Sequence, residues 1–166
     1  MVKCPSCNAD VPTGTRWCAI CHTNVVNPGI GKLASPIKRL GAYIFDLLIP
    51  IVALFLIFLI GGGIGAAIGG EEGGGVGIVL GFLLLVAYIV WALVLFAKGT
   101  TPGKRLLGMR VIREDGRNAG FFIMLIRELV GKAISGMILS LGFLWILFDR
   151  DNQGWHDKLV STYVVG

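Results

Sequence analysis

The sequence predicts an all-α polytopic membrane protein with about three transmembrane or re-entrant helices, preceded by a small cysteine-rich module. The 166 residues are 55% hydrophobic and only 15% charged, whereas soluble domains are about 45–50% apolar and about 25% charged. Long apolar runs follow residue 40, and all four cysteines lie within the first 21 residues. This composition argues against an ordinary soluble enzyme. It also excludes a disordered chain, which needs low hydrophobicity.

The cysteines form two C-x2-C pairs, Cys4 with Cys7 and Cys18 with Cys21, separated by ten residues. Two such pairs bring four thiolates to one metal, and Zn²⁺ prefers four ligands in a tetrahedron. The segment over residues 1–24 resembles a short zinc ribbon. We expect one structural Zn²⁺ per chain, because four protein ligands leave no open coordination position. Iron suits the same four thiolates, so it remains the alternative metal.

Two disulfides are the competing interpretation, but they suit secreted domains, and no secretory leader is expected here, because the first apolar run begins only after Leu40. His22 directly follows the last cysteine and is expected at the surface rather than as a ligand. The ribbon is not expected to bind nucleic acid, because Lys3 and Arg16 are its only basic residues, against Asp10. Residues 25–36 contain Asn-Pro-Gly and Ser-Pro turns and are predicted to be a linker.

The domain that follows, over residues 37–166, begins with two apolar runs that predict membrane-spanning helices of about residues 38–60 and 76–97. The first run carries one charge, Asp46, and one proline, Pro50, and the second carries no charge. A crossing needs about 20 apolar residues. Both runs therefore have the length and composition of transmembrane helices.

A third apolar region, residues 121–148, falls into two halves. Its first half is interrupted by Arg127, Glu128 and Lys132. Its second half starts at Ala133 and has 16 uncharged residues, which make about 24 Å of helix. We expect one short crossing by the second half, with the first half lying as an amphipathic helix near the interface. A re-entrant hairpin broken near Ser135-Gly136 is the alternative.

Basic residues predict the orientation. Residues 1–42 carry five basic side chains and one acidic, and residues 98–119 carry six basic and two acidic. Residues 61–75 carry none, with two glutamates. The N-terminus and the second loop are therefore expected in the cytoplasm. Glycine recurs at every fourth position from 61 to 81. We expect a mobile loop over 61–75, with only Gly77 and Gly81 on a helix-packing face.

Several later segments match a known family in order and spacing. They are residues 99–111, 113–116, 126–129 and 153–165, with Arg39 and Asp46 ahead of them. Residues 35–166 resemble the RDD family of membrane proteins, named for one arginine and two aspartates. The resemblance places these at Arg39, Asp46 and Asp157. It implies transport of an unspecified ligand, and monovalent cation/proton antiport has been proposed for some members.

Asp46 is the strongest candidate for ion coupling on physical grounds. It lies seven residues after Arg39, about 10 Å deeper along a helix, and an ionisable group there is costly and usually functional. Such a carboxylate can exchange a proton for a small cation. Arg39 is too far away along a straight helix, so Arg127 is the expected partner. A fixed Asp46–Arg127 ion pair that only holds the bundle together is the alternative.

Other basic residues are expected at lipid headgroups, namely Lys38, Lys104 and Arg105. The Gly-Lys sequence at 103–104 does not fit a phosphate-binding loop, because its spacing is short and an arginine replaces the Ser/Thr. Residues 109–113 and 161–165 are strand-prone. They would pair if both were cytoplasmic, which would favour the re-entrant alternative.

Two functions follow as hypotheses. The first is a homo-oligomeric transporter that exchanges protons for monovalent cations, with the ribbon as a regulatory or docking module. The second is a non-transporting membrane adaptor whose ribbon recruits a protein partner. No enzyme is expected, because His156 and Asp157 are adjacent and lack a credible nucleophile nearby.

Overall fold

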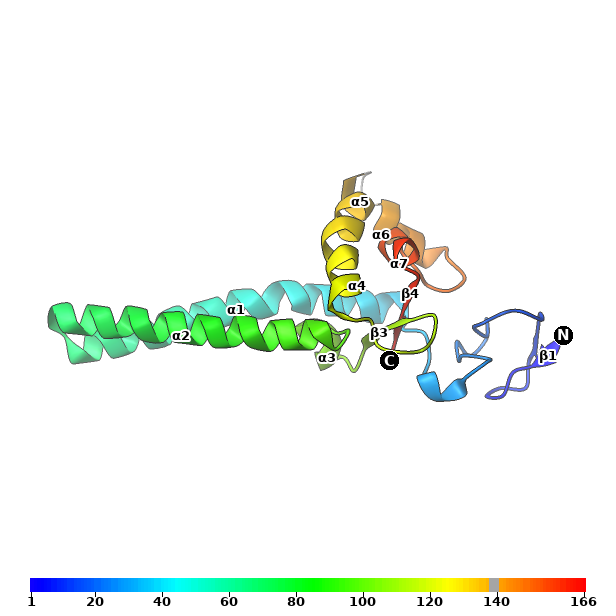
Figure 1. The fold of residues 1–166 in the computed structure, drawn as a ribbon, viewed down its shortest axis with the longest axis horizontal. Helices are drawn as coiled ribbons and strands as arrows, with labels where there is room; N and C mark the ends of the chain where they lie inside the picture. The colour runs from blue at the N-terminus through cyan, green and yellow to red at the C-terminus, as the bar shows by residue number, and fades with distance from the viewer. Residues whose placement is uncertain (138–140) are drawn as a thin grey trace.

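The computed structural model describes residues 1–137 and 141–166, and three parts follow one another along its longest dimension (Figure 1). A hairpin of two long helices forms one end, and the cysteine ribbon forms the other. Between them lies a cap of short helices with a two-stranded sheet at its base. The cap is the place where segments from both halves of the chain meet.

The hairpin consists of α1 (Pro36–Ile68) and α2 (Gly70–Ala97). Ser35 begins α1 as its N-cap, because its hydroxyl accepts the Lys38 N–H, and a proline takes the first helical position. The two helices meet at Gly69, whose φ of 76° is left-handed. Residues 61–75 are therefore almost wholly helical, and the mobile loop expected there is wrong.

The glycine row explains why the two helices extend so far. An added Cβ on Gly61 would lie 2.8 Å from the carbonyl oxygen of Gly77, and one on Gly65 would lie 2.7 Å from that of Gly73. A spacing of four places these glycines on one helix face, where the backbones approach closely. The packing face thus includes Gly61, Gly65 and Gly73 in addition to Gly77, whereas an added Cβ on Gly81 would make only ordinary contact.

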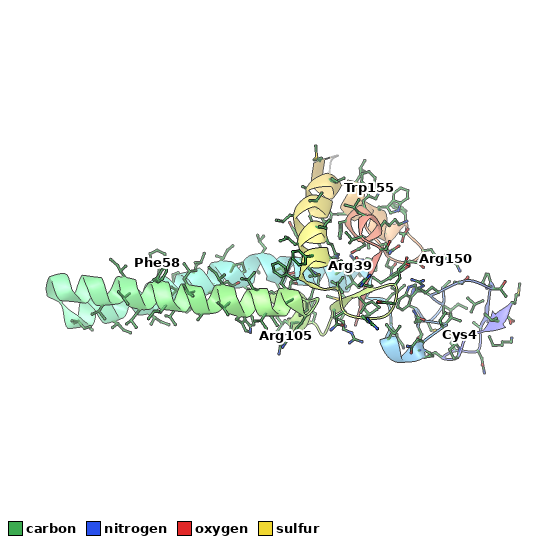
Figure 2. The ribbon with its side chains drawn as sticks, viewed as in Figure 1. Cys4, Arg39, Phe58, Arg105, Arg150 and Trp155 are labelled. Carbon is green, nitrogen blue, oxygen red and sulfur yellow. The ribbon has the colours of Figure 1, made fainter. Side chains whose placement is uncertain are left out.

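Both hairpin helices are long and apolar enough to cross a membrane. The qualifying stretches are all 33 residues of α1 and the 25 residues Gly73–Ala97 of α2. Within the most apolar 18-residue stretch of each helix, only 6% of the residues are buried inside the protein. Large apolar side chains such as Phe58 project outward from the hairpin (Figure 2). A helix that is apolar all round and exposed to this extent needs an apolar environment.

The cap is built from short elements. They are α3 (Pro102–Leu106), β3 (Arg110–Arg113), α4 (Phe121–Leu125), the π-helical η2 (Ile126–Gly131), α5 (Lys132–Met137), α6 (Leu141–Leu144), η3 (Trp145–Leu147), α7 (Trp155–Leu159) and β4 (Thr162–Val165). The rod formed by α4, η2 and α5 runs across the long axis of the hairpin, and α6 and α7 lie beside it (Figure 1).

Strands β3 and β4 pair antiparallel, with Arg110 opposite Val165 and Arg113 opposite Thr162. The all-α expectation therefore needs correction, because the strand-prone segments do form a sheet. Since β3 follows the hairpin and β4 ends the chain, region 121–148 starts and returns at the same end of the hairpin. This path fits the re-entrant alternative for residues 121–148 rather than one crossing. Helix α5 continues through 135–136, and part of the expected second half, residues 138–140, lies outside the described residues.

The ribbon is packed against the sheet rather than hanging from a free linker. It contains β1 (Val2–Lys3) and β2 (Asp10–Val11), and the 3-10 turn η1 (Pro28–Ile30) follows in the segment predicted to be a linker. Trp17 is buried in a cluster with Leu33, Ile112, Tyr163 and Val165. The Leu33 N–H donates to the His22 carbonyl at 2.9 Å, and the Gly166 N–H donates to the Lys32 carbonyl at 3.0 Å.

Candidate functional site

The four cysteines converge as the sequence predicts. Their sulfur atoms all lie within 4.8 Å of one another, and the cysteines are free rather than disulfide-bonded. The Sγ atoms of Cys4 and Cys21 are 3.5 Å apart, and those of Cys7 and Cys18 are 3.7 Å apart. A tetrahedral Zn²⁺ with bonds of about 2.3 Å separates its sulfurs by about 3.8 Å. The donor set therefore fits one tetrahedral metal ion.

Each C-x2-C pair forms the same tight turn. The Asn8 N–H donates to the Cys4 carbonyl, and the His22 N–H donates to the Cys18 carbonyl, both at 2.9 Å. Asn8 and His22 are left-handed, with φ of 59° and 56°, a conformation that Asn and His tolerate better than most residues. His22 thus follows the second turn and lies outside the cysteine cluster.

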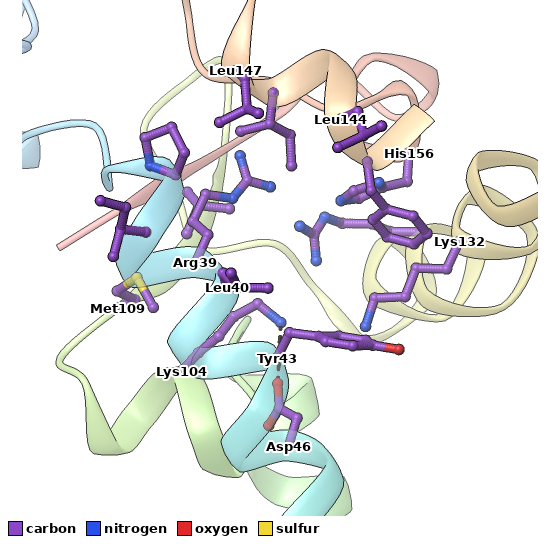
Figure 3. A pocket seen from close by; sticks show the side chains of 16 residues that line it. Arg39, Leu40, Tyr43, Asp46, Lys104, Met109, Lys132, Leu144, Leu147 and His156 are labelled. Carbon is purple, nitrogen blue, oxygen red and sulfur yellow. Dashed lines mark ion pairs between the residues drawn. The ribbon is translucent and has the colours of Figure 1, made fainter. Parts of the chain in front are cut away.

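A second site is a network of charged side chains where the base of the hairpin meets the cap, and Figure 3 shows its members Arg39, Asp46, Lys104 and Lys132. Its members are Arg39 and Asp46 from α1, Lys104 from α3, Arg127 and Glu128 from η2, Lys132 from α5, and Asp157 from α7. The network joins segments more than a hundred residues apart in the sequence. All of its side chains except Lys132 are at most 16% exposed.

Asp157 is the centre of one half of this network. Its carboxylate is fully buried and pairs with Arg39, while Arg127 donates from Nε and Nη2 at 2.7 Å each. The Gly154 N–H adds a bond of 3.1 Å at the start of α7. Burial alone would raise the pKa of Asp157, but Arg127 and Arg39 hold it well below its usual range. The carboxylate therefore stays ionised between two guanidinium groups.

Asp46 forms the other half with the loop after α2. It accepts a hydrogen bond of 2.6 Å from the Thr101 hydroxyl and one of 2.7 Å from the Gly103 N–H, and Lys104 Nζ lies 3.6 Å away. An added Cβ on Gly103 would lie 2.7 Å from the Asp46 nitrogen, so only glycine allows this approach. The expected Asp46–Arg127 pair is wrong, because Arg127 bonds Asp157 and Glu128 instead.

Lys104 connects the two halves. Its Nζ lies 3.4 Å from a Glu128 oxygen and 3.6 Å from an Asp46 oxygen. Burial lowers the pKa of Lys104 to about 8, against the attraction of Glu128. Burial would raise the pKa of Glu128, but Lys104, Arg127 and Lys132 hold it at about 2. Lys104 is only 8% exposed, so it lies inside the network and not on the open surface, and the headgroup contact expected for it stays a prediction.

The remaining residues predicted to be functional differ in how exposed their side chains are. Lys38 and Arg105 are exposed, as headgroup contacts require, whereas Arg39 is drawn into the network. Sequence reasoning missed Glu128 as a partner, as well as Thr101 and Gly103. The sequence carried features that could have identified these residues. Thr101 and Gly103 lie in the Gly-Thr-Thr-Pro-Gly-Lys motif, and Glu128 follows Arg127 directly.

A cavity of about 400 Å³ lies beside the network. Figure 3 shows Arg39, Lys104 and Lys132 reaching toward it from three different elements. His156 also lines it. Burial lowers the pKa of His156 to about 3, against the attraction of Asp157, so this imidazole is neutral at physiological pH.

Comparisons with known proteins show the family of this chain. The RDD family model matches residues 33–161, so the chain belongs to the RDD family. Arg39, Asp46 and Asp157, at which the sequence resemblance placed the arginine and the two aspartates of the family name, all fall in the network. "Uncharacterized protein YckC" of Bacillus subtilis (strain 168) is 28% identical over 130 residues, covering 76% of this chain and 80% of that protein.

A second relative matches a shorter stretch. "Proline-rich antigen" of Mycobacterium leprae (strain TN) is 32% identical over 84 residues, which cover 49% of this chain and 33% of that protein. No solved structure matches the chain significantly. The ribbon, before residue 33, lies outside the family match.

Proposed function

We propose that this chain is a membrane protein that exchanges protons for monovalent cations at Lys104, Asp46 and Glu128. The observation that carries the proposal is a buried ammonium group placed between two carboxylates from different elements, beside a cavity. Two apolar helices and membership of the RDD family support placement in a membrane. We assign the N-terminus to the cytoplasm from the distribution of basic residues.

Lys104 is the cation in the network that is held most loosely. Its contacts to Glu128 and Asp46 are 3.4 and 3.6 Å, whereas Arg127 contacts its carboxylates at 2.7 Å. Charge-assisted hydrogen bonds are strongest near 2.7–2.9 Å. The Lys104 ammonium is therefore the group that a competing cation displaces at the lowest cost.

The exchange balances in charge. When Lys104 releases its proton to water, Asp46 and Glu128 lose the one positive charge placed between them, and one monovalent cation replaces it. When the proton returns, the ammonium expels the cation. A pKa of about 8 allows this step near neutral pH. In this scheme Arg39 and Arg127 keep Asp157 ionised and hold the cap on the hairpin.

Proton flux in proteoliposomes tests the proposal. Under Na⁺, K⁺ or Li⁺ gradients, we expect wild-type protein to move protons and the Lys104→Gln and Asp46→Asn variants to lose that flux. Lys98→Gln is the matched control, because Lys98 is an exposed lysine at the end of α2. It should leave flux unchanged. Flux that survives in both site variants would overturn the coupling site.

An absence of flux from folded protein would favour the second function, the adaptor. The observation behind that function is the close packing of the ribbon on the sheet. Trp17 is buried against the sheet, and the centres of the Trp17 and Tyr163 rings are 5.5 Å apart. We further propose that the protein forms homo-oligomers, since two or three helices rarely enclose a pathway. We propose no catalytic role for His156 and Asp157.

We propose Zn²⁺ as the metal of the ribbon, at one ion per chain. Elemental analysis of purified protein should find one zinc, and Cys18→Ser should remove it, because the metal supplies most of the folding energy of so small a module. Ala19→Ser, which alters the same turn but no ligand, should retain the metal. Iron found in place of zinc would overturn the metal identity, and oxidised cysteines without metal would overturn the site.

A further inference from the structure

The cavity beside the charged network has two chemically different walls. One wall carries the cationic groups of Arg39, Lys104, Arg127 and Lys132. The other wall is apolar and comprises Ile37, Leu40, Phe143, Leu144 and Leu147. Asp46 is the acidic residue among those lining it, whereas Glu128 and Asp157, which pair with the four cations, are not among the lining residues. The space itself is therefore cationic on one side and apolar on the other.

The apolar wall opens toward the surface of the hairpin. Leu40 is 60% exposed, Leu144 is 49% exposed and Leu147 is 61% exposed, although all three line the cavity. Tyr43 continues this rim along α1, and Lys132 Nζ lies 5.5 Å from the centre of its ring. Beyond Tyr43, α1 presents the apolar surface that we place in the membrane. The cavity thus lies where lipid headgroups meet the hairpin.

We propose that this cavity binds the anionic headgroup of a membrane phospholipid. The phosphate would lie among the cationic groups, with Lys132 at the rim, and the acyl chains would cover Leu40, Leu144 and Leu147. A free phosphate would leave the apolar rim bare, and a zwitterionic headgroup would place a second cation against the cationic wall. The inference rests on the membrane placement proposed above, but it does not depend on ion exchange.

Native mass spectrometry of the full chain in neutral detergent tests this without any flux measurement. Phosphatidylglycerol, phosphatidylcholine and inorganic phosphate serve as the three probes. We expect one phosphatidylglycerol per chain, bound about tenfold more tightly than phosphatidylcholine, as a charge-assisted contact warrants. Equal binding of the two lipids, or tight binding of inorganic phosphate, would overturn the lipid headgroup as the ligand.

Two independent pairs of variants locate the binding. Leu144→Trp fills the cavity without changing charge, and its control is Leu141→Trp, an exposed position on the same helix that does not line the cavity. Lys132→Gln removes the rim cation, and its control is Lys98→Gln, an exposed lysine at the end of α2 that does not line the cavity.

We expect each cavity variant to weaken phosphatidylglycerol binding about tenfold, while each control changes it by about twofold or less. Thermal unfolding midpoints near the wild-type value show that a variant is folded. Equal losses in the cavity and control variants would show general attraction to the surface and overturn the site.

Discussion

The hairpin and the cap are held together by opposite means. The hairpin joins its helices through a row of glycines, at which carbonyl oxygens of one helix approach the backbone of the other. The cap joins its segments through buried ion pairs around Asp157 and Lys104. One region thus relies on small size and close packing, and the other relies on charge.

The difference follows from what each region can bury. Lipid is as apolar as leucine, so helices in a membrane gain little from apolar side chains and associate by close packing. The cap elements α3, α4 and α7 have five residues each, too few to form stable helices alone. Ion pairs with α1 anchor two of these short elements, α3 through Lys104 and Asp46 and α7 through Asp157 and Arg39. The two regions should therefore respond differently to changes in size, charge and pH.

The largest effect is expected from Asp157→Asn. This change leaves the buried guanidinium groups of Arg39 and Arg127 without their shared carboxylate, and an uncompensated buried charge costs about 3–5 kcal/mol. Thermal unfolding in detergent, followed by tryptophan fluorescence, measures the loss.

Asp115→Asn is the control for this charge change, because Asp115 is exposed, pairs with Arg113 and accepts a hydrogen bond from the Arg117 N–H that an asparagine oxygen can also accept. That variant should cost about 1 kcal/mol or less. If both variants unfold alike, the buried network does not stabilise the cap.

The sequence was sufficient to predict the parts that local patterns determine. The C-x2-C spacing predicted the convergence of four sulfurs, and the apolar runs predicted both long helices. The residues quoted for the RDD resemblance predicted the family that the comparison shows. In each case the signal lies within a short stretch of chain.

Pairings across the fold were harder to predict. Asp46 and Arg127 were expected to pair because both are charges in apolar runs, but the choice between Arg127 and Lys104 depends on how α3 folds back onto α1. The glycine row was predicted to be a loop because glycine disfavours isolated helices. That propensity is overridden once a second glycine row faces the first.

A smaller effect is expected in the hairpin, from Gly65→Val. The new Cβ would lie 2.7 Å from the Gly73 carbonyl oxygen, and such overpacking typically costs about 1–3 kcal/mol. Gly63→Val is the matched control, since a Cβ there meets nothing within 4 Å. Equal unfolding midpoints for the two variants would show that the helices separate freely, and the contrast with the cap would fail.

The smallest effect is expected from pH, and it should be confined to the cap. The folded protein holds the pKa of His156 at about 3, below its ordinary 6.5. Between these values the unfolded chain binds a proton that the folded chain does not, so stability falls as pH falls. From pH 7.5 to 5.5 this group should remove about 1 kcal/mol. Below pH 4.5 Glu128 adds to the loss in the same direction, because its pKa is about 2 in the folded protein.

The His156→Gln variant separates the histidine from the carboxylates. Its unfolding midpoint should change little between pH 7.5 and 5.5, whereas the wild type and Gly65→Val should lose stability in parallel over that range. The parallel loss is expected because Gly65 packs against a backbone carbonyl and contributes no titratable group. If the unfolding midpoint of Gly65→Val changed with pH differently from that of the wild type, the hairpin and the cap would be coupled through charge.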